Sequence, residues 1–269
     1  MGILDNRVVI ITGAGGGLGA AHARVFASEG ACVLVNDINR DAAQKVVDDI
    51  VAAGGRAAVN TSDITNYADS ENAVRQAIET WGDLHVVVNN AGINRDRMFA
   101  SMTEAEWDAI MAVHLKGHFC ISSHAVHYWR DQAKAGNKVD ARIINTTSGA
   151  GLQGSIGQSN YAAAKAGIAA LTLTAVESMA TRMAKPEDGS FDYWAPENVS
   201  SLLAWLASAE AAHVTGRVFE AEGGRISIAD GWRTTEGVDK GDRWLPAEVG
   251  EAMQALLAAE VPAQPVYGA

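Results

Sequence analysis

The chain has 269 residues, of which 48% are apolar and 20% charged, with a net charge of −11 and a pI near 5.0. This length and balance are typical of one globular domain, which we assign to residues 1 to 269, with a core from 6 to 230 and a C-terminal extension from 231 to 269. Because the net charge is acidic and no cluster of Lys or Arg stands out, we do not expect a nucleic-acid-binding surface. We find neither a signal-peptide pattern nor an apolar run near the ~20 residues of a membrane span, so we expect a cytoplasmic protein. Cys32 and Cys120 lie in apolar runs, which favours reduced, buried thiols.

The first predicted elements are a buried strand, Arg7 to Ile11, a glycine-rich turn, 12 to 19, and a helix, Ala20 to Ser28. This order is typical of a dinucleotide site, because glycines let the backbone approach a pyrophosphate and the free N–H groups of the helix start face its charge. The alternative is a flexible loop. The position directly after a buried strand favours phosphate binding, and we predict that the cofactor contacts lie at Gly13, Gly16, Gly17, Leu18 and Gly19.

A second apolar run, Ala31 to Asn36, ends in Asp37. A carboxylate there accepts hydrogen bonds from ribose hydroxyls and repels a 2′-phosphate, which favours NAD over NADP. Arg40 is the counter-argument, because a guanidinium could bind that phosphate. The structural alternative for Asp37 is a helix N-cap for residue 41 onward.

Two further strands and two helices follow in alternation. The helices are Ala42 to Ala53 and Ala68 to Trp81, and the strands are Arg56 to Thr61 and Leu84 to Val88. The turn before the second helix contains Asp63, which can cap that helix, contact the adenine edge of a cofactor, or do both at once. The fourth strand ends in two amides and a small pair that leave room for a ribose. From these two turns we predict cofactor contacts at Asp63, Ile64, Asn90, Ala91 and Gly92.

Residues Met102 to Trp129 carry a long helical pattern with an interruption at Gly117, and this segment holds four histidines. The pairs 114/118 and 124/127 have same-face spacing, which suggests a metal site. The two pairs are ten residues apart, however, so they point in different directions, and no acid lies among them. We therefore predict structural or solvent-facing histidines and no metal.

A fifth strand, Ala141 to Thr147, leads into Ser148, and Tyr161 opens a helical segment thirteen residues later. Lys165 follows Tyr161 by four, so both side chains share one helix face. A phenol titrates near pH ~10, and an adjacent cation favours phenolate, which lowers the pKa of the tyrosine toward a useful value. Ser148 can hold the substrate oxygen. The alternative is that Tyr161 and Lys165 are ordinary amphipathic neighbours.

Five strands alternating with four helices predict an α/β fold, a doubly wound parallel sheet with helices on both faces. Ligands of such sheets bind at the carboxyl ends of the strands. Gly13, Asp37, Asn89 and Ser148 all fall at such ends, and their agreement is stronger than any one motif.

The segments TGAGGGLG and NNAG, the serine and the YAAAK motif resemble the short-chain dehydrogenase/reductase family in order and spacing, from Asn6 to Ala180. The resemblance implies that Tyr161 is the proton donor or acceptor, that Lys165 binds the nicotinamide ribose, and that Ser148 orients the alcohol or carbonyl. It also places Asp63 at the adenine. His114 stands where many members have an asparagine that holds a proton-relay water; an imidazole can bind that water too, and the pH profile could differ.

The segments NNAGINRDRMF, VHLKGHF and GQSNYAAAKAGI are most similar to those of bacterial family members related to the dehydrogenase part of peroxisomal multifunctional enzymes, which oxidise 3-hydroxyacyl-CoA. The resemblance implies an NAD-dependent oxidoreductase that interconverts a secondary alcohol and a ketone, for example a 3-hydroxyacyl-CoA or a hydroxysteroid. It also implies a homotetramer formed through the helices of His114 and Tyr161. Arg95 and Arg97 could meet a CoA phosphate or be ordinary surface arginines.

The chain departs from the family after the predicted helix Tyr161 to Ala180. Residues 181 to 196 contain no β-branched run fit for a buried strand, whereas Thr215 to Glu222 resembles the last core strand. We therefore expect the sixth strand and the loop after it to be missing, with the junction between about Ala180 and Lys185. A helix from Glu197 to Ala207 and a last one from Ala247 to Ala259 are predicted, the latter covering the substrate cleft or a neighbouring subunit. The expected absence of the loop after the sixth strand, together with His114, motivates one alternative function, a nucleotide-binding regulatory or scaffolding protein without turnover.

Overall fold

The computed structural model describes residues 2–171, 174–178, 191–215 and 217–229, together with positions 254 and 256. Within these residues one eight-stranded sheet has the order β3-β2-β1-β4-β5-β6-β7-β8. Neighbouring strands are parallel except for the antiparallel pair β7 and β8. The strands are β1 Val8–Thr12, β2 Cys32–Asn36, β3 Arg56–Asn60, β4 Val86–Asn89, β5 Arg142–Thr146, β6 Thr174–Ser178, β7 Arg217–Glu222 and β8 Arg225–Ala229. The predicted doubly wound parallel sheet is confirmed.

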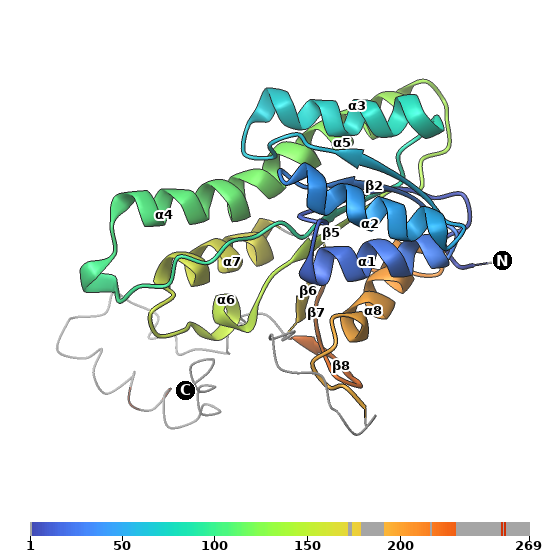
Figure 1. Cartoon of the computed structure of the whole chain (residues 1–269). Coiled ribbons are helices and arrows are strands. Elements are labelled where there is room, and N and C mark those ends of the chain that lie inside the picture. The colour runs from blue at the N-terminus through green and yellow to red at the C-terminus, as the bar shows by residue number, and fades with distance from the viewer. Residues whose placement is uncertain are drawn as a thin grey trace, which may run out of the picture.

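Helices cover both faces of the sheet (Figure 1). One layer consists of α1 Gly17–Ser28, α2 Arg40–Ala52 and α8 Glu197–Ala207, and the opposite layer of α3 Tyr67–Trp81 and α5 Gly117–Lys134. Three further helices lie beside the second layer: α4 Glu104–Ile110 and α6 Gly149–Gln153 both pack against α7 Ser159–Leu171.

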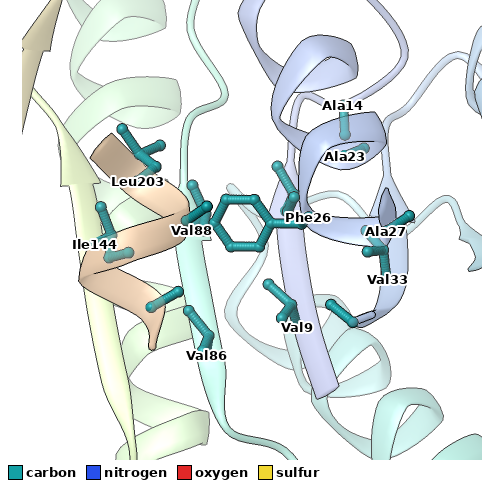
Figure 2. Close-up of a cluster of buried hydrophobic side chains, with 14 of the residues drawn as sticks. Val9, Ala14, Ala23, Phe26, Ala27, Val33, Val86, Val88, Ile144 and Leu203 are labelled. Atoms are coloured by element: carbon teal, nitrogen blue, oxygen red, sulfur yellow. The ribbon is translucent and has the colours of Figure 1, made fainter. Parts of the chain in front are cut away.

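The larger core lies between the sheet and the layer of α1, α2 and α8. Figure 2 shows the ring of Phe26, which is fully buried, between the valines of β1 and β4 and Leu203 of α8. Every residue of β1, β2 and β4 is buried, as the continuous apolar runs predict for parallel strands covered on both faces. Burying one such large side chain stabilises the fold by ~1.5–3 kcal/mol.

Asparagine and threonine side chains cap three of the helices. Asn39 accepts from the backbone N–H of Ala42 at the start of α2, and Asn66 accepts from that of Asp69 at the start of α3. Thr103 and Glu106 form a reciprocal capping box on α4. The capping alternatives for Asp37 and Asp63 are therefore wrong, because a nearer asparagine takes that position in each case.

The predicted long helix with an interruption at Gly117 has its irregularity elsewhere. Met111–Lys116 is a π-helical segment between α4 and α5, and it carries His114. Gly117 opens α5, and a Cβ there would lie 2.8 Å from Cδ1 of Ile64. The glycine thus allows close packing of α5, whereas the π-helical turn shifts the residues next to the site.

The expectation of a missing sixth strand is wrong. β6 lies between β5 and β7, with Ala175 opposite Asn145 and Val176 opposite Thr146. The helix that was expected to reach Ala180 ends at Leu171, and the strand begins three residues later. The sequence of this strand, Thr-Ala-Val-Glu-Ser, is too short to distinguish a strand from a helix by its period, and its internal position in the sheet selects the strand. The junction near 180 to 185 lies outside the described residues, as does most of the C-terminal extension; positions 254 and 256 of the predicted last helix are helical.

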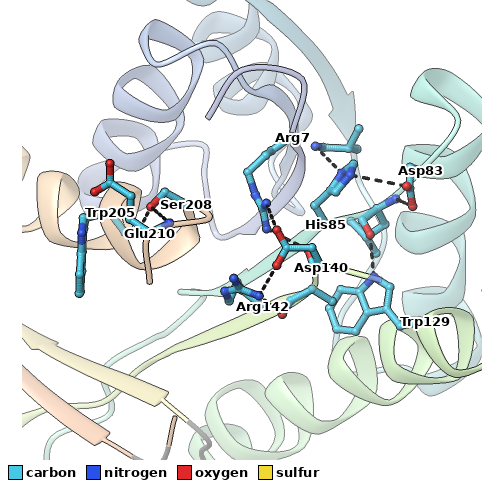
Figure 3. A network of polar contacts seen from close by, with 12 residues as sticks. Arg7, Asp83, His85, Trp129, Asp140, Arg142, Trp205, Ser208 and Glu210 are labelled. Carbon is cyan, nitrogen blue, oxygen red and sulfur yellow. Dashed lines mark hydrogen bonds and ion pairs between the residues drawn. The ribbon is translucent and has the colours of Figure 1, made fainter. Parts of the chain in front are cut away.

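A polar clamp of Arg7, Asp140, Arg142 and His85 closes the amino ends of β1, β4 and β5 (Figure 3). Asp140 contacts Arg7 at 2.8 Å and Arg142 at 2.6 Å. Nδ1 of His85 accepts from the N–H of Val8 at 3.0 Å. Burial disfavours the Asp140 carboxylate, but the hydrogen bond and charge of Arg7 prevail and lower its pKa. The clamp fixes the end of the sheet that is opposite the predicted site.

Candidate active site

A cleft of about 610 Å³ lies at the carboxyl ends of the strands. Its walls include Gly13, Gly16, Gly17, Leu18, Asp37, Asn90 and Gly92 from the predicted cofactor set, and His114, Tyr161 and Lys165 from the predicted catalytic set. Members of both predicted sets therefore share one cavity. A second cavity of about 540 Å³, between the ends of α1 and α2, contains none of them.

The turn after β1 is fixed by Thr12 and Asn90. Oγ1 of Thr12 accepts from the N–H groups of Asn90 and Ala91 at 3.0 and 3.1 Å, and Nδ2 of Asn90 donates to the carbonyl of Thr12 at 3.0 Å. Gly16, at the N-cap of α1, is extended, and a Cβ on it would meet nothing within 4 Å. No side chain caps α1 and no acid lies in its first turn. The helix start thus offers free N–H groups and open space, which suits a phosphate.

Asp37 follows β2, and its carboxylate is held in place by two backbone N–H groups. Oδ2 accepts from Gly15 at 3.0 Å and Oδ1 from Asn39 at 2.9 Å. Arg40 lines a separate hollow of about 450 Å³ between α2 and α3. The charge that faces the cleft here is therefore negative.

Tyr161 and Lys165 lie one turn apart on α7. Lys165 is buried, its Nζ donates to the carbonyl of Thr146 at 2.6 Å, and the same atom lies 5.6 Å from the centroid of the Tyr161 ring. Burial lowers the pKa of Lys165 to about 7. The amine and the phenol ring are thus close neighbours at the inner end of the cleft.

His114 packs edge-on against Tyr161, with ring centroids 5.1 Å apart. Its Nε2 lies 2.8 Å from the carbonyl oxygen of Ile93 and 3.1 Å from the backbone nitrogen of the same residue, so this ring nitrogen can donate to the first or accept from the second, according to the tautomer. Nδ1 is buried and has no hydrogen-bond partner in the described part of the chain. Burial, with the nearby charge of Lys165, lowers the pKa of His114 to about 4, so the ring is neutral at pH 7.

Ser148 lies two residues after the end of β5 and is the N-cap of α6. It is 8% exposed, and its Oγ accepts from the N–H of Ala150 at 3.3 Å. It does not itself line the cleft, although Thr146, two residues earlier, does.

Four predicted cofactor residues also lie outside the cleft wall: Gly19, Asp63, Ile64 and Ala91. Ile64 is buried against Gly117. Gly19 packs so tightly on the turn that a Cβ would lie 2.3 Å from the carbonyl oxygen of Gly13. Ile64 and Gly19 therefore support the walls of the site.

The remaining cleft residues were not predicted: Ile93, Asn94, Thr146, Asp192, Trp194 and Pro196. The first three could have been found, because they follow or end predicted strands β4 and β5. Nothing in the sequence of 191 to 196 indicates that this loop reaches the site.

Within the described ranges, no group of three or more His, Cys, Asp or Glu side chains could hold a metal ion. Two of the four histidines bond to backbone instead, His124 to the carbonyl of Tyr67 and His127 to that of Ser123. The helices described here include none that is long and apolar enough to cross a membrane.

The family model of the short chain dehydrogenases matches residues 7–184. The chain belongs to the short-chain dehydrogenase family. Its relatives include the hydroxyacyl-CoA dehydrogenase ChsB1 of Mycobacterium tuberculosis, 39% identical over 97% of this chain and 92% of that protein. The peroxisomal multifunctional enzyme type 2 of mouse is 40% identical over 82% of this chain, which spans about a third (32%) of that larger protein.

Solved structures of the family have the same fold. A short chain dehydrogenase from Mycobacterium avium is 53% identical over the whole of both chains, with a TM-score of 0.94. A 7α-hydroxysteroid dehydrogenase, complexed with NADH and 7-oxo glycochenodeoxycholic acid, is 28% identical over 82% of this chain and 94% of that one, with a TM-score of 0.72. The chain is accordingly an oxidoreductase that acts on the CH–OH group of secondary alcohols, as predicted, and no finding supports the regulatory or scaffolding alternative.

Proposed function

We propose that the protein uses NAD to interconvert a 3-hydroxyacyl-CoA and its 3-oxo form, with Tyr161 as the acid–base group. The observation that carries the proposal is the single cleft that contains the glycine turn, Asp37, Tyr161 and Lys165. Proton and hydride must leave the same carbinol, so both sets of groups have to face one space.

The shape of the cleft fits a dinucleotide. The uncapped start of α1 and the open space at Gly16 suit the pyrophosphate. The carboxylate of Asp37 suits the adenosine ribose hydroxyls and opposes a 2′-phosphate, and Arg40 lies in a different hollow. These contacts favour NAD over NADP.

A bound NAD would supply the hydride acceptor for the alcohol. Tyr161 accepts the hydroxyl proton, and the Lys165 ammonium near its ring favours the phenolate. Ser148 does not line the cleft itself, but it lies two residues after Thr146 of the cleft wall. We assign the orientation of the substrate oxygen to its hydroxyl, which accepts from Ala150 and can donate its own hydrogen. His114 is neutral, and its Nδ1, which has no partner among the described residues, is available for a hydrogen bond with a water or a substrate hydroxyl in the cleft.

The hydroxyacyl-CoA assignment rests on the relatives and on Arg95. ChsB1 matches almost the whole of both chains, and its name states that substrate class. Of the two arginines after β4, Arg97 is paired with Glu106 at 2.7 Å. Among the described residues, the side chain of Arg95 donates only to the neighbouring carbonyl of Asn94, and it can swing to a phosphate. A hydroxysteroid is the second candidate, because the 7α-hydroxysteroid dehydrogenase has the same fold.

We also propose a cytoplasmic homotetramer assembled through the helices of His114 and Tyr161. Phe119 and Val126 on α5 are about half exposed, at 50% and 48%, which supports a contact there. Sedimentation velocity measures the assembly directly; a monomer at micromolar concentration would contradict it.

A cofactor-coupled panel of 3-hydroxyacyl-CoA thioesters, hydroxysteroids and simple secondary alcohols tests the activity. We expect NADH formation with the thioesters. In Tyr161→Phe, kcat falls by ~10²–10⁴-fold while NADH still binds, because only the acid–base group is lost. Unchanged turnover in that variant would remove Tyr161 from the mechanism, and a panel without any NADH formation would overturn the substrate proposal.

A further inference from the structure

Asn160 immediately precedes Tyr161 on α7 and is fully buried. Its side-chain oxygen accepts from the backbone N–H of Tyr161 at 2.8 Å. That N–H lies in the first turn of α7, where intrahelical acceptors are lacking, so the amide supplies the partner.

The amide nitrogen of Asn160 reaches two other segments. It donates to the carbonyl of Arg95 at 3.1 Å, in the loop after β4, and to the carbonyl of Glu106 at 3.3 Å, in α4. Both N–H donors and one acceptor site of the side chain are thereby used. One buried side chain thus joins the start of α7, the loop and α4.

These three segments surround Tyr161. The loop continues from Ile93, which bonds to His114, and α4 runs into the π-helical turn that carries His114. The His114 ring in turn packs edge-on against Tyr161. The position of Tyr161 relative to His114 is therefore set by how α7 sits on the loop and on α4.

Two other bonds connect the same loop to the segment before α7. Arg97 donates its backbone N–H to the carbonyl of Gly157 at 2.8 Å, and Nε2 of Gln158 donates to Asp96 at 3.0 Å. The Gln158 bond is exposed and competes with water, whereas the bonds of Asn160 are shielded and directional. Among these side chains, Asn160 is the one suited to fix the geometry.

We propose that Asn160 is a positioning residue, which holds Tyr161 and the loop 93 to 97 in register for proton transfer. The proposal rests on the proposed function, in that Tyr161 is taken as the acid–base group. A displacement of ~1 Å at a reacting group costs ~10²-fold in rate. Loss of the amide should therefore reduce turnover without removing any group that touches the cofactor.

The test compares Asn160→Asp and Asn160→Ser with Gln158→Ala as the matched control. Asn160→Asp keeps the shape but places acceptors against two carbonyl oxygens, and Asn160→Ser leaves space for water. We expect kcat to fall ~10²-fold in both, with the Kd for NADH within threefold of the wild-type value, and amide exchange in 94 to 97 and 158 to 162 to accelerate at least tenfold. Gln158→Ala should stay within threefold in all three measurements.

Three results would overturn the proposal. These are kcat within threefold of wild type, a parallel loss of kcat and NADH affinity, or failure of both Asn160 variants to fold, which would make the residue purely structural. Inactivity of the wild-type protein on the whole substrate panel would instead contradict the proposed function, and the exchange measurement would still report on Asn160 because it needs no turnover.

Discussion

Replacing His22 by Asn should make the fold less sensitive to acid. His22 lies on α1, is 1% exposed, and its Nδ1 is 2.7 Å from Oγ of Ser200 on α8. Burial lowers its pKa from 6.5 to about 3. Between these pH values the unfolded chain binds a proton that the folded chain excludes, so stability is lost as the pH falls below 6.5.

The size of the effect follows from that pKa shift. At pH 5, about 1.5 pH units below the value in the unfolded chain, the neutral buried imidazole costs about 2 kcal/mol of stability, at 1.36 kcal/mol per unit. Asn does not titrate and keeps a short polar arm toward Ser200. The variant loses packing at every pH, so the informative quantity is the change in its stability difference from wild type.

Urea unfolding at pH 7.5 and pH 5, at one fixed protein concentration, measures this difference. We expect the free energy of unfolding of His22→Asn, relative to that of the wild type, to increase by about 2 kcal/mol between pH 7.5 and pH 5. Contributions from the other buried histidines cancel, because both proteins contain them. His213→Asn is the control, since that side chain is exposed and remains in water in either state. A stability difference that stays constant within about 0.5 kcal/mol would refute the reasoning.

Three further outcomes are expected. Asp37→Ser should lower kcat/KM with NAD by ~10–100-fold, because charged hydrogen bonds to the ribose are lost, and raise kcat/KM with NADP, because the repulsion of the 2′-phosphate is lost. An unchanged ratio of kcat/KM with NAD to kcat/KM with NADP would contradict this. Gly16→Ala should fold normally but weaken NADH binding, whereas Gly19→Ala should lower the melting temperature, because only the second Cβ meets protein atoms; equal melting temperatures would disprove the distinction. Burial holds the pKa of Lys165 near 7, so between pH 7 and 10.5 the unfolded chain binds more protons than the folded chain. The free energy of unfolding, relative to that of Lys165→Met, should therefore rise by about 2 kcal/mol from pH 7 to 9, as chemical unfolding can measure. A difference between the two proteins that does not change with pH would argue against a buried amine.

Most of the sheet could be predicted because burial on both faces leaves a simple pattern. β1, β2 and β4 are uninterrupted apolar runs, each followed by a turn, and the pattern predicts where their carboxyl ends meet. Gly13 and Asp37 were found in this way, Tyr161 and Lys165 through their spacing on a helix, and the four residues do share a cleft.

The errors arose where two local patterns compete. The segment 174 to 178 continues a helical period, but pairing with β5 and β7 makes it a strand. Asp63 looked like a cap, yet Asn66 holds that place; Asp63 instead accepts from the N–H of Thr65. The first outcome depends on strands that are distant in the chain, and the second on the backbone angle at which the helix begins. Neither can be read directly from the order of the residues.

The sequence also contained no indication of the residues that support the cleft through contacts distant in the chain. Asn160 carries no motif of its own, and its importance is apparent only when Arg95 and Glu106, far away in the chain, are seen to share its amide. Trp194 and Asp192 reach the cleft from a loop of unremarkable composition.

The arrangement of the clamp and the cleft at opposite ends of the sheet matters for engineering. Arg7, Asp140 and Arg142 secure the strands where they begin, at the opposite ends of β1 and β5 from the residues that line the cleft. Libraries aimed at new substrates can therefore vary the loops 93 to 97 and 191 to 196 and leave the clamp untouched. Heat tolerance and selectivity become separate design variables in this scaffold, because effects of distant sites add nearly independently.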